Sequence, residues 1–310
     1  MPQLALPSAP TNELMLADWV EILALISPDE NSSRGDLESA LKTASVLEAK
    51  GEAAIEEKCL QVFSELEERS KSADSSYPFS IDAGTLTVKQ DRSQFVGYLF
   101  CLFLSYFRWK SQRHKEVGIN PWLLFEELCS IAAKNYVAGT VISFGTSRGQ
   151  SNKALKAFRI SIDELGKALG EGGGFRDQPI RGVKDDKVDL IAWKDFNDGW
   201  PSKLVVFGQC AAGADWLDKD SDLDPEPFWG QWMSIPKVSP HIRSFYIPHR
   251  IRKDLWDQRA RRTGVLFDRC RIAYWSFQEN MAVLSDPRYQ KWCNFVLNKH
   301  LKVKGSIKSP

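Results

Sequence analysis

Two short apolar runs in the middle of the chain constrain its fold most. VDLIAWK, residues 188–194, and KLVVFGQC, residues 203–210, are rich in β-branched and aromatic side chains. The segment between them, DFNDGWPS, has the polar, Gly- and Pro-containing composition of a hairpin loop. The two runs therefore predict neighbouring strands, with Asp189 at the start of the first and Gln209 at the end of the second.

The pattern around these strands predicts an α/β (α+β) protein. A helix is expected to begin after Asn120, a good N-cap, with Pro121 at its first position. A strand and turn are expected over residues 140–149, a helix opened by Ser161, and a final helix over residues 287–301. Residues 170–175, GEGGGF, are interpreted as a flexible turn between a helix and a strand. The expected architecture is an N-terminal helical domain followed by a mixed sheet flanked by helices.

The chain has 310 residues, which is enough for two domains. We expect residues 1–115 to form a mostly helical, acidic domain that regulates or docks a partner. Residues 116–310 are expected to form the functional domain, with a basic C-terminal part. The apolar run at 95–107 is shorter than the roughly 20 residues of a membrane span, so it predicts a buried core helix.

Charge is distributed unevenly, although the net charge is only +1. Residues 13–70 carry fourteen acidic and five basic side chains, whereas residues 241–275 carry nine basic and three acidic ones. Aromatic residues interleave with the arginines, which is typical of a surface that holds phosphates and stacks on bases. The alternative is a basic segment packed against the acidic front of the chain. The expected nucleic-acid contacts are Arg250, Arg252, Arg259, Arg261 and Arg262.

The six cysteines are scattered, without a CxxC pair or a Cys/His cluster. This pattern favours neither a zinc site nor a disulfide framework, and with no leader-like N-terminus it predicts a cytoplasmic protein. The segment GQCAAGADW, residues 208–216, is weakly similar to sequence around a protease cysteine. Gln209 is adjacent to Cys210 rather than upstream of it, so a core cysteine is the better interpretation.

Asp189 and Gln209 predict a metal site. Neighbouring strands lie about 5 Å apart, so side chains at adjoining strand ends converge. Mg²⁺ prefers oxygen ligands and retains several waters. A carboxylate, an amide oxygen and a nearby lysine are therefore a set that supports metal-assisted phosphodiester hydrolysis.

The order of these residues resembles that of the PD-(D/E)XK nuclease superfamily, which has the restriction-endonuclease-like fold. The resemblance covers roughly residues 120–220 and depends on LFEELCSIAAKNYV, VDLIAWK and LVVFGQC. A glutamine in place of the second acid is typical of the branch that resembles methylation-dependent restriction enzymes. The resemblance implies that Asp189 binds Mg²⁺ or Mn²⁺ and that Gln209 and the Cys210 carbonyl complete the metal shell. It also implies that Glu126 holds a metal-bound water.

One position departs from the superfamily pattern. The expected lysine would fall at Ala211, which cannot stabilise charge. Lys219 is the replacement that we expect to stabilise the transition state, with Lys194 and Lys203 as alternatives. Asp186 is a further candidate metal ligand.

These observations predict a metal-dependent DNA endonuclease, which the resemblance places in a prokaryotic defence system. The expected partners are DNA, an ATPase or sensor protein and a second copy of the chain, with no membrane. The alternative is a catalytically degenerate nuclease-fold subunit that binds DNA or a protein, which Ala211 favours. A third hypothesis, a helical adaptor whose strands are only scaffold, predicts no stabilisation by Mg²⁺ or Mn²⁺.

Overall fold

The computed structural model describes residues 4–46, 51–107, 117–144, 152–176, 187–278 and 283–301. The chain divides into two compact units. Unit 1 comprises residues 1–119, 249–252 and 269–310, and unit 2 comprises residues 120–248 and 253–268. We expected residues 116–310 to form one domain, but the C-terminal segment from Arg269 belongs to unit 1.

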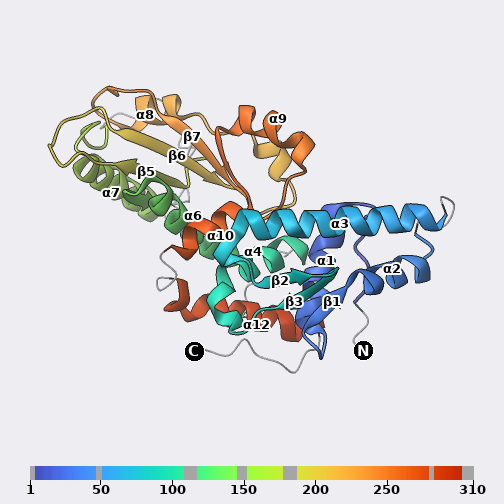
Figure 1. The fold of residues 1–310 in the computed structure, drawn as a ribbon. Coiled ribbons are helices and arrows are strands. Elements are labelled where there is room, and N and C mark those ends of the chain that lie inside the picture. Colours follow the sequence, from blue (N-terminus) through green and yellow to red (C-terminus); the bar gives the residue numbers. More distant parts are fainter. Residues whose placement is uncertain are drawn as a thin grey trace. The chain divides into compact units, whose positions relative to one another are not determined.

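Unit 1 contains helices around a small antiparallel sheet with strand order β1-β3-β2 (Figure 1). Its elements are α1 (Glu13–Ile26), β1 (Asn31–Ser33), α2 (Arg34–Thr43), α3 (Glu52–Ala73), η2 (Asp74–Ser76), β2 (Phe79–Asp82), β3 (Thr85–Val88), η3 (Arg92–Phe95), α4 (Val96–Tyr106), α10 (Arg269–Phe277) and α12 (Pro287–Leu301). The C-terminal helix α12 lies where the sequence predicts it.

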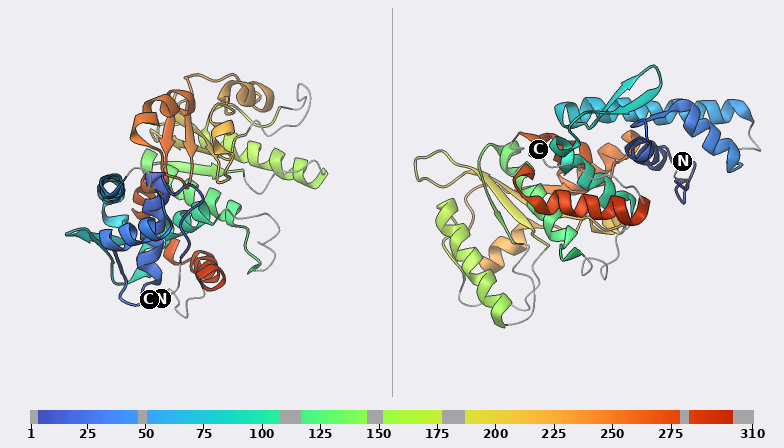
Figure 2. Two further views of the ribbon diagram at one scale, coloured as in Figure 1. Left: turned by 90° about the vertical axis from the view of Figure 1, so that its right-hand side faces the viewer. Right: turned by 90° about the horizontal axis from the view of Figure 1, so that it is seen from below.

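Helix α4 is the core of unit 1. All its residues from Val96 to Leu104 are buried, which confirms the expected core helix. Helix α12 packs along it, and the two lie side by side in Figures 1 and 2. The Phe100 ring meets Tyr289 and Trp292 edge-on, at centroid distances of 5.3 and 4.9 Å. Full burial of such side chains contributes about 1.5–3 kcal/mol each, so α12 stabilises unit 1. In the described parts of the chain, no helix is long and apolar enough to span a membrane.

A buried ionic cluster joins the N-terminal and C-terminal segments of unit 1. Arg69 and Arg269 are fully buried, and both donate to Asp18, at 2.7 and 2.8 Å. Glu21, also fully buried, accepts from Arg69 at 2.9 Å and from the hydroxyls of two tyrosines at 2.8 Å, Tyr77 and Tyr98. Burial raises the pKa of Glu21. Burial by itself would raise the pKa of Asp18 as well, but Arg269 and Arg69 lower it below its ordinary value.

Unit 2 is built on a mixed five-stranded sheet with strand order β4-β5-β6-β7-β8. The first two pairings are antiparallel and the last two are parallel. Its elements are α6 (Pro121–Val137), β4 (Thr140–Ser143), α7 (Asn152–Leu169), β5 (Leu190–Lys194), β6 (Leu204–Cys210), η5 (Trp216–Lys219), α8 (Pro225–Trp232), β7 (Ile242–Tyr246), α9 (Lys253–Thr263) and β8 (Val265–Phe267). The predicted neighbouring strands are thus β5 and β6, and the chain as a whole is a mixed α/β protein.

Helix starts in unit 2 agree only partly with the sequence. Helix α6 begins as predicted, with the Asn120 side chain accepting from the backbone of Trp122 and Leu123 and with Pro121 at the first position. Helix α7 begins at Asn152, so the expected start at Ser161 was wrong. The buried residues of α7 that pack against the sheet, such as Ile162, Leu165 and Leu169, lie after Ser161, so the apolar pattern marked only this part of the helix.

Helices cover both faces of the unit 2 sheet. Alternate strand residues such as Ile191, Trp193, Val205 and Phe207 pack with buried side chains of α7 and α8. Helix α6 packs on β4, β5 and β6 from the other face, in agreement with its position in Figure 1. Because side chains alternate along a strand, Gln209 shares the face of Phe207, whereas Cys210 shares the opposite face.

Candidate functional site

Asp189 lies at the point where β5 begins and is only 2% exposed. Its backbone N–H donates to the Gly208 carbonyl, and its carbonyl accepts from Phe144 N–H, both at 2.8 Å. Its carboxylate Oδ2 accepts the backbone N–H of Cys210 at 2.6 Å. The side chain therefore takes the place of a backbone carbonyl at the end of the β5–β6 ladder, which fixes its position.

Gln209 lies opposite Asp189. Leu190 pairs with Gly208, and extending this register by one residue sets Asp189 across from Gln209. Gln209 is 4% exposed, and its Oε1 has no hydrogen-bond partner in the described part of the chain. A buried acceptor without a donor costs about 1–3 kcal/mol. This amide oxygen is therefore a suitable ligand for a cation or an ordered water.

Glu126 comes to the site from helix α6. The residue is 7% exposed and lies one turn before Cys129 on the same helix. Burial raises the pKa of the Cys129 thiol, and the negative charge of Glu126 raises it further. Glu126 thus lies on the face of the sheet that carries Cys210, and Gln209 points to the other face. Asp189 lies across from Gln209 in the extended register, and its carboxylate accepts the Cys210 N–H.

The described residues fit Mg²⁺ only in part. They contain no group of three or more His, Cys, Asp or Glu side chains that could hold a metal ion. Asp186, the further candidate ligand, lies outside the described residues. Mg²⁺ is nonetheless commonly held by one or two carboxylates together with waters and substrate phosphates. The Asp189 carboxylate and the Gln209 amide oxygen satisfy that smaller requirement.

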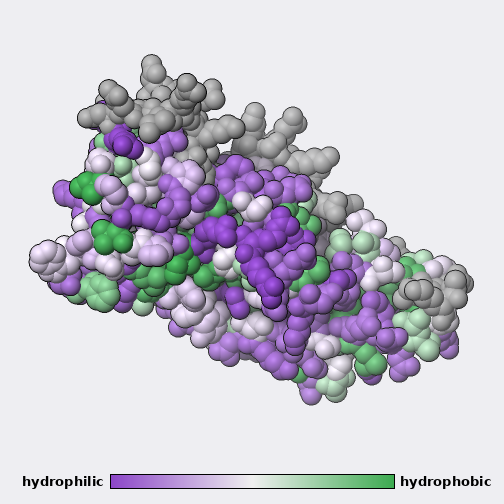
Figure 3. Space-filling model, turned by 90° about the horizontal axis from the view of Figure 1, so that it is seen from above, coloured by the Kyte–Doolittle hydropathy of each residue, from purple (hydrophilic) through white to green (hydrophobic). Residues whose placement is uncertain are grey.

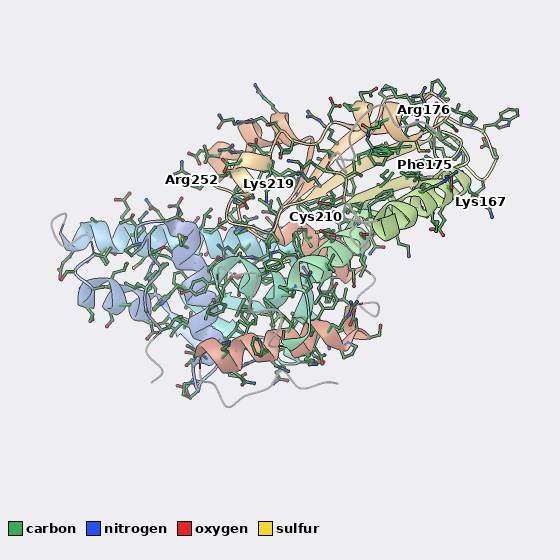
Figure 4. The ribbon with its side chains drawn as sticks, turned by 180° about the vertical axis from the view of Figure 1, so that it is seen from behind. Lys167, Phe175, Arg176, Cys210, Lys219 and Arg252 are labelled. Atoms are coloured by element: carbon green, nitrogen blue, oxygen red, sulfur yellow. The ribbon has the colours of Figure 1, made fainter. Side chains whose placement is uncertain are left out.

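The three candidate lysines have other partners. Lys219 Nζ lies 2.9 Å from Asp215 on the same turn and lowers the pKa of that carboxyl. Lys194 donates to the Ala138 carbonyl, at the far end of β5. Lys203 is 3% exposed and donates to the Trp200 carbonyl in the hairpin loop, at 2.8 Å. In Figure 4, Lys219 and Cys210 lie toward one end of unit 2, and Phe175 lies at the other.

The candidate nucleic-acid arginines have varied surroundings. Arg250 belongs to unit 1, where its Nε lies 3.0 Å from Glu65. On α9, Arg259 and Arg262 both reach the buried carboxylate of Asp220, at 2.7 and 3.0 Å. Arg252 and Arg261 are exposed. The alternative expectation from the sequence is that the basic segment packs against the acidic front of the chain. That alternative describes Arg250, which pairs with Glu65, and Arg269, which pairs with Asp18.

The glycine-rich turn at 170–174 packs closely against the residues after α8. The Ile235 N–H donates to the Gly172 carbonyl at 2.9 Å, and the Ser234 N–H donates to the Gly174 carbonyl at 3.0 Å. A Cβ at Gly172, where φ is +81°, would lie 2.5 Å from both Trp229 and Met233. The residues do form a turn after α7, but close packing and the positive φ of Gly172 and Gly173 hold it in place, so the expectation that the turn is flexible is corrected.

Exposed apolar side chains gather at the end of the unit 2 sheet away from Asp189. The β5–β6 loop, the start of β6 and the segment leading into β7 all lie at this end, because β6 and β7 run parallel. Hydrophobic residues, drawn in green, interrupt a largely hydrophilic face in Figure 3. Patches of this kind mark interaction surfaces. The set is Phe196, Trp200, Leu204, Ile235, Val238 and Ile242, each between 39% and 72% exposed.

Cys129 is the residue near the site that the sequence did not reveal. It is fully buried on α6, the helix that packs on β6. The only signal in the sequence is that Cys129 lies three residues after Glu126, on the same helix face. The partner strand could not be inferred from that spacing.

Comparisons with known proteins do not assign this chain to a family. No protein-family model, no curated protein and no solved structure matches this chain.

Proposed function

We propose that this protein is a metal-dependent DNA endonuclease of PD-(D/E)XK type that hydrolyses phosphodiester bonds. The observation that carries the proposal is the β5–β6 strand end. There the Asp189 carboxylate is held by the Cys210 N–H, opposite the buried Gln209 oxygen that has no hydrogen-bond partner in the described residues. A mixed sheet with helices on both faces agrees with the restriction-endonuclease-like fold that the resemblance implies.

The residues of this strand end have separate roles in the proposal. Asp189 and Gln209 supply oxygen ligands, with the Cys210 carbonyl as a third. Glu126, which reaches the strand end from the face opposite to Gln209, would hold a metal-bound water. A bound Mg²⁺ or Mn²⁺ supplies Lewis-acid activation of the phosphate and a lowered pKa for bound water. The fixed position of Asp189 matters because a ligand held in place loses little conformational freedom when the cation binds.

DNA would be held by the exposed arginines of the basic segment. Arg252 and Arg261 are exposed, and the Arg262 side chain is 48% exposed although it pairs with Asp220. Arginine contacts to phosphates position a duplex without reading its sequence. The apolar patch at the other end of unit 2 supports a protein partner, such as the ATPase or sensor of a defence system.

A second candidate function is a nuclease-fold subunit that binds DNA or a protein without cleaving. Two observations favour it. Ala211 is 2% exposed and stands where the superfamily has its lysine, and Lys219 is engaged with Asp215. If the described residues bring no cation to the metal ligands, the negative charge of the transition state would be stabilised by the metal alone.

A comparison of Asp189→Asn with wild type in the presence of Mn²⁺ tests the two functions. Asparagine keeps an acceptor for the Cys210 N–H but removes the negative charge. We expect DNA cleavage to fall by more than roughly 100-fold, because even residues one shell further from a metal commonly change activity 10- to 100-fold. Asp198→Asn, an exposed position in the β5–β6 loop, is the matched control and should leave cleavage unchanged.

Thermal unfolding with and without Mn²⁺ separates the remaining outcomes. Cleavage that is equal in wild type and Asp189→Asn would overturn the site. Stabilisation by Mn²⁺ in wild type but not in Asp189→Asn, without cleavage, would support the non-cleaving subunit. No stabilisation and no cleavage would favour the adaptor whose strands are only scaffold.

A further inference from the structure

A fourth lysine, Lys187, lies beside the Asp189 strand end. It comes two residues before Asp189, in the turn that leads into β5. Two residues span at most roughly 7 Å of extended chain, so the backbone at Lys187 lies close to that of Asp189. Lys187 has a φ of +62°, a left-handed conformation that residues other than glycine seldom adopt. Strained positions of this kind are concentrated at active sites and ligand-binding segments.

The side chain of Lys187 crosses from the start of β5 to the segment that follows β6. Its Nζ donates to Asp222 Oδ2, and Asp222 lies between the end of β6 and the start of α8. The adjacent Leu223 packs in the same core cluster as Phe207, so this segment lies on the face of the sheet that Gln209 shares. The ammonium is therefore held at the strand end that carries the proposed ligands.

The pair of Lys187 and Asp222 is accessible to solvent. The Lys187 side chain is 50% exposed and the Asp222 side chain is 29% exposed. Ion pairs near the surface contribute little to folding stability. Lysine is also a common phosphate-binding residue in proteins, because its ammonium is a mobile point charge. A phosphate at the strand end can therefore replace the Asp222 carboxylate at a small cost to the fold.

We propose that Lys187 contacts a DNA phosphate at this strand end and that Asp222 holds the ammonium when DNA is absent. The inference rests on the proposed function, which brings DNA to the Asp189 carboxylate. Lys187 supplies a cation where Ala211 cannot. DNA exchanges one anionic partner of Lys187 for another, so the Asp222 carboxylate opposes DNA binding and acts as an autoinhibitory contact.

The test measures the affinity of the full-length protein for a short fluorescent DNA duplex, by anisotropy at several salt concentrations. All proteins carry Asp189→Asn and are kept in EDTA, so that the duplex stays intact and no carboxylate at Asp189 repels it. Lys187→Gln should weaken binding and reduce the slope of log affinity against log salt by about 0.9, the value for one phosphate contact. Lys187→Arg should restore the slope. Asp222→Asn should strengthen binding, because it removes the competing carboxylate.

Lys237 and Glu226 provide the matched control. They form a second accessible pair, with side chains 31% and 56% exposed, and Lys237 precedes β7 at the other end of the unit 2 sheet. Lys237→Gln and Glu226→Gln change the net charge by the same amounts as the test variants. Both should leave the salt slope and the affinity unchanged.

The opposite signs expected for the two test variants separate a phosphate contact from a structural pair. An unchanged salt slope in Lys187→Gln would overturn the proposal. Asp222→Asn that weakens binding as much as Lys187→Gln would overturn it as well, because the pair would then only hold the segment in place. Thermal unfolding of each variant identifies any that fails to fold, and Lys187→Arg then decides the result.

Failure of the proposed function is measured separately, as Mn²⁺-dependent cleavage by protein with Asp189 intact. A reduced salt slope in Lys187→Gln together with no cleavage by wild type would overturn the nuclease and support the phosphate contact. Cleavage by wild type together with an unchanged slope would support the nuclease and overturn the role of Lys187. No DNA binding by any of the proteins would overturn both.

Discussion

At the residue scale, the buried ionic cluster of unit 1 is the feature most sensitive to substitution, because each of its charged groups needs a partner. Arg69 and Arg269 share the carboxylate of Asp18, and Arg269 also donates to Ser105 Oγ at 2.6 Å. Arg69 donates further to Glu65 at 2.8 Å and to the Leu14 carbonyl at 3.0 Å. Buried ion pairs repay their desolvation only when every group is satisfied. Nearly every charged group of this cluster has a partner. Removing one member would therefore leave another buried charge without its partner.

Arg269→Ala should therefore destabilise unit 1 by about 3–5 kcal/mol, the cost of breaking a buried ion pair. Arg288→Ala is the matched control, because Arg288 pairs with Asp286 on the surface and its side chain is 48% exposed. Such a pair contributes about 1 kcal/mol or less. Urea unfolding followed by circular dichroism measures both, and equal shifts in the two variants would contradict the role given to Arg269.

At the element scale, tight packing between helices and turns determines which glycines of unit 2 can be replaced by a larger residue. Helix α7 passes so close to the glycine-rich turn that a Cβ at Gly166 would lie 1.4 Å from the Gly173 carbonyl oxygen. Gly230, in α8, has nothing within 4 Å of the same position. The two glycines are both helical, so they differ chiefly in what surrounds them.

Gly166→Ala should destabilise unit 2 by about 3 kcal/mol or more, since the clash is with backbone rather than with a mobile side chain. Gly230→Ala should be neutral or stabilising by about 0.5–1 kcal/mol, because alanine restricts the unfolded chain. Denaturant midpoints of the two variants test this contrast. A Gly166→Ala variant as stable as wild type would show that α7 and the turn are less closely packed.

At the scale of the whole molecule, unit 1 needs both ends of the chain. Residues 269–310 belong to it together with residues 1–119, whereas unit 2 is contained in residues 120–268 apart from the short segment 249–252. Trp292 on α12 packs on Phe100 of α4, and Arg269 binds Asp18 of α1. The core of unit 1 is incomplete without its C-terminal part.

A fragment of residues 120–268 should therefore unfold cooperatively on heating, whereas residues 1–119 alone should not. Adding a peptide of residues 269–310 to the second fragment should restore cooperative unfolding. Circular dichroism melting curves check both fragments. A cooperative transition of residues 1–119 without the peptide would contradict this division.

The sequence by itself determined the features that depend on neighbouring residues. Asn120 and Pro121 fix the start of α6, the two apolar runs with a polar loop define β5 and β6, and α12 covers the residues that its apolar spacing predicts. The juxtaposition of Asp189 and Gln209 followed from the same hairpin. Caps, turns and hydrophobic periodicity are local, and so they can be recognised from a single chain.

Only the tertiary structure decided which distant groups meet. Arg269 has its charge partner Asp18 in α1, 251 residues away in the sequence, and Lys219 pairs with Asp215. The same amino-acid composition would allow many other pairings. Which charged side chains pair depends on how whole helices and strands pack. Residue types therefore predicted the strand end at Asp189, and the fold alone decided that the candidate lysines have other partners.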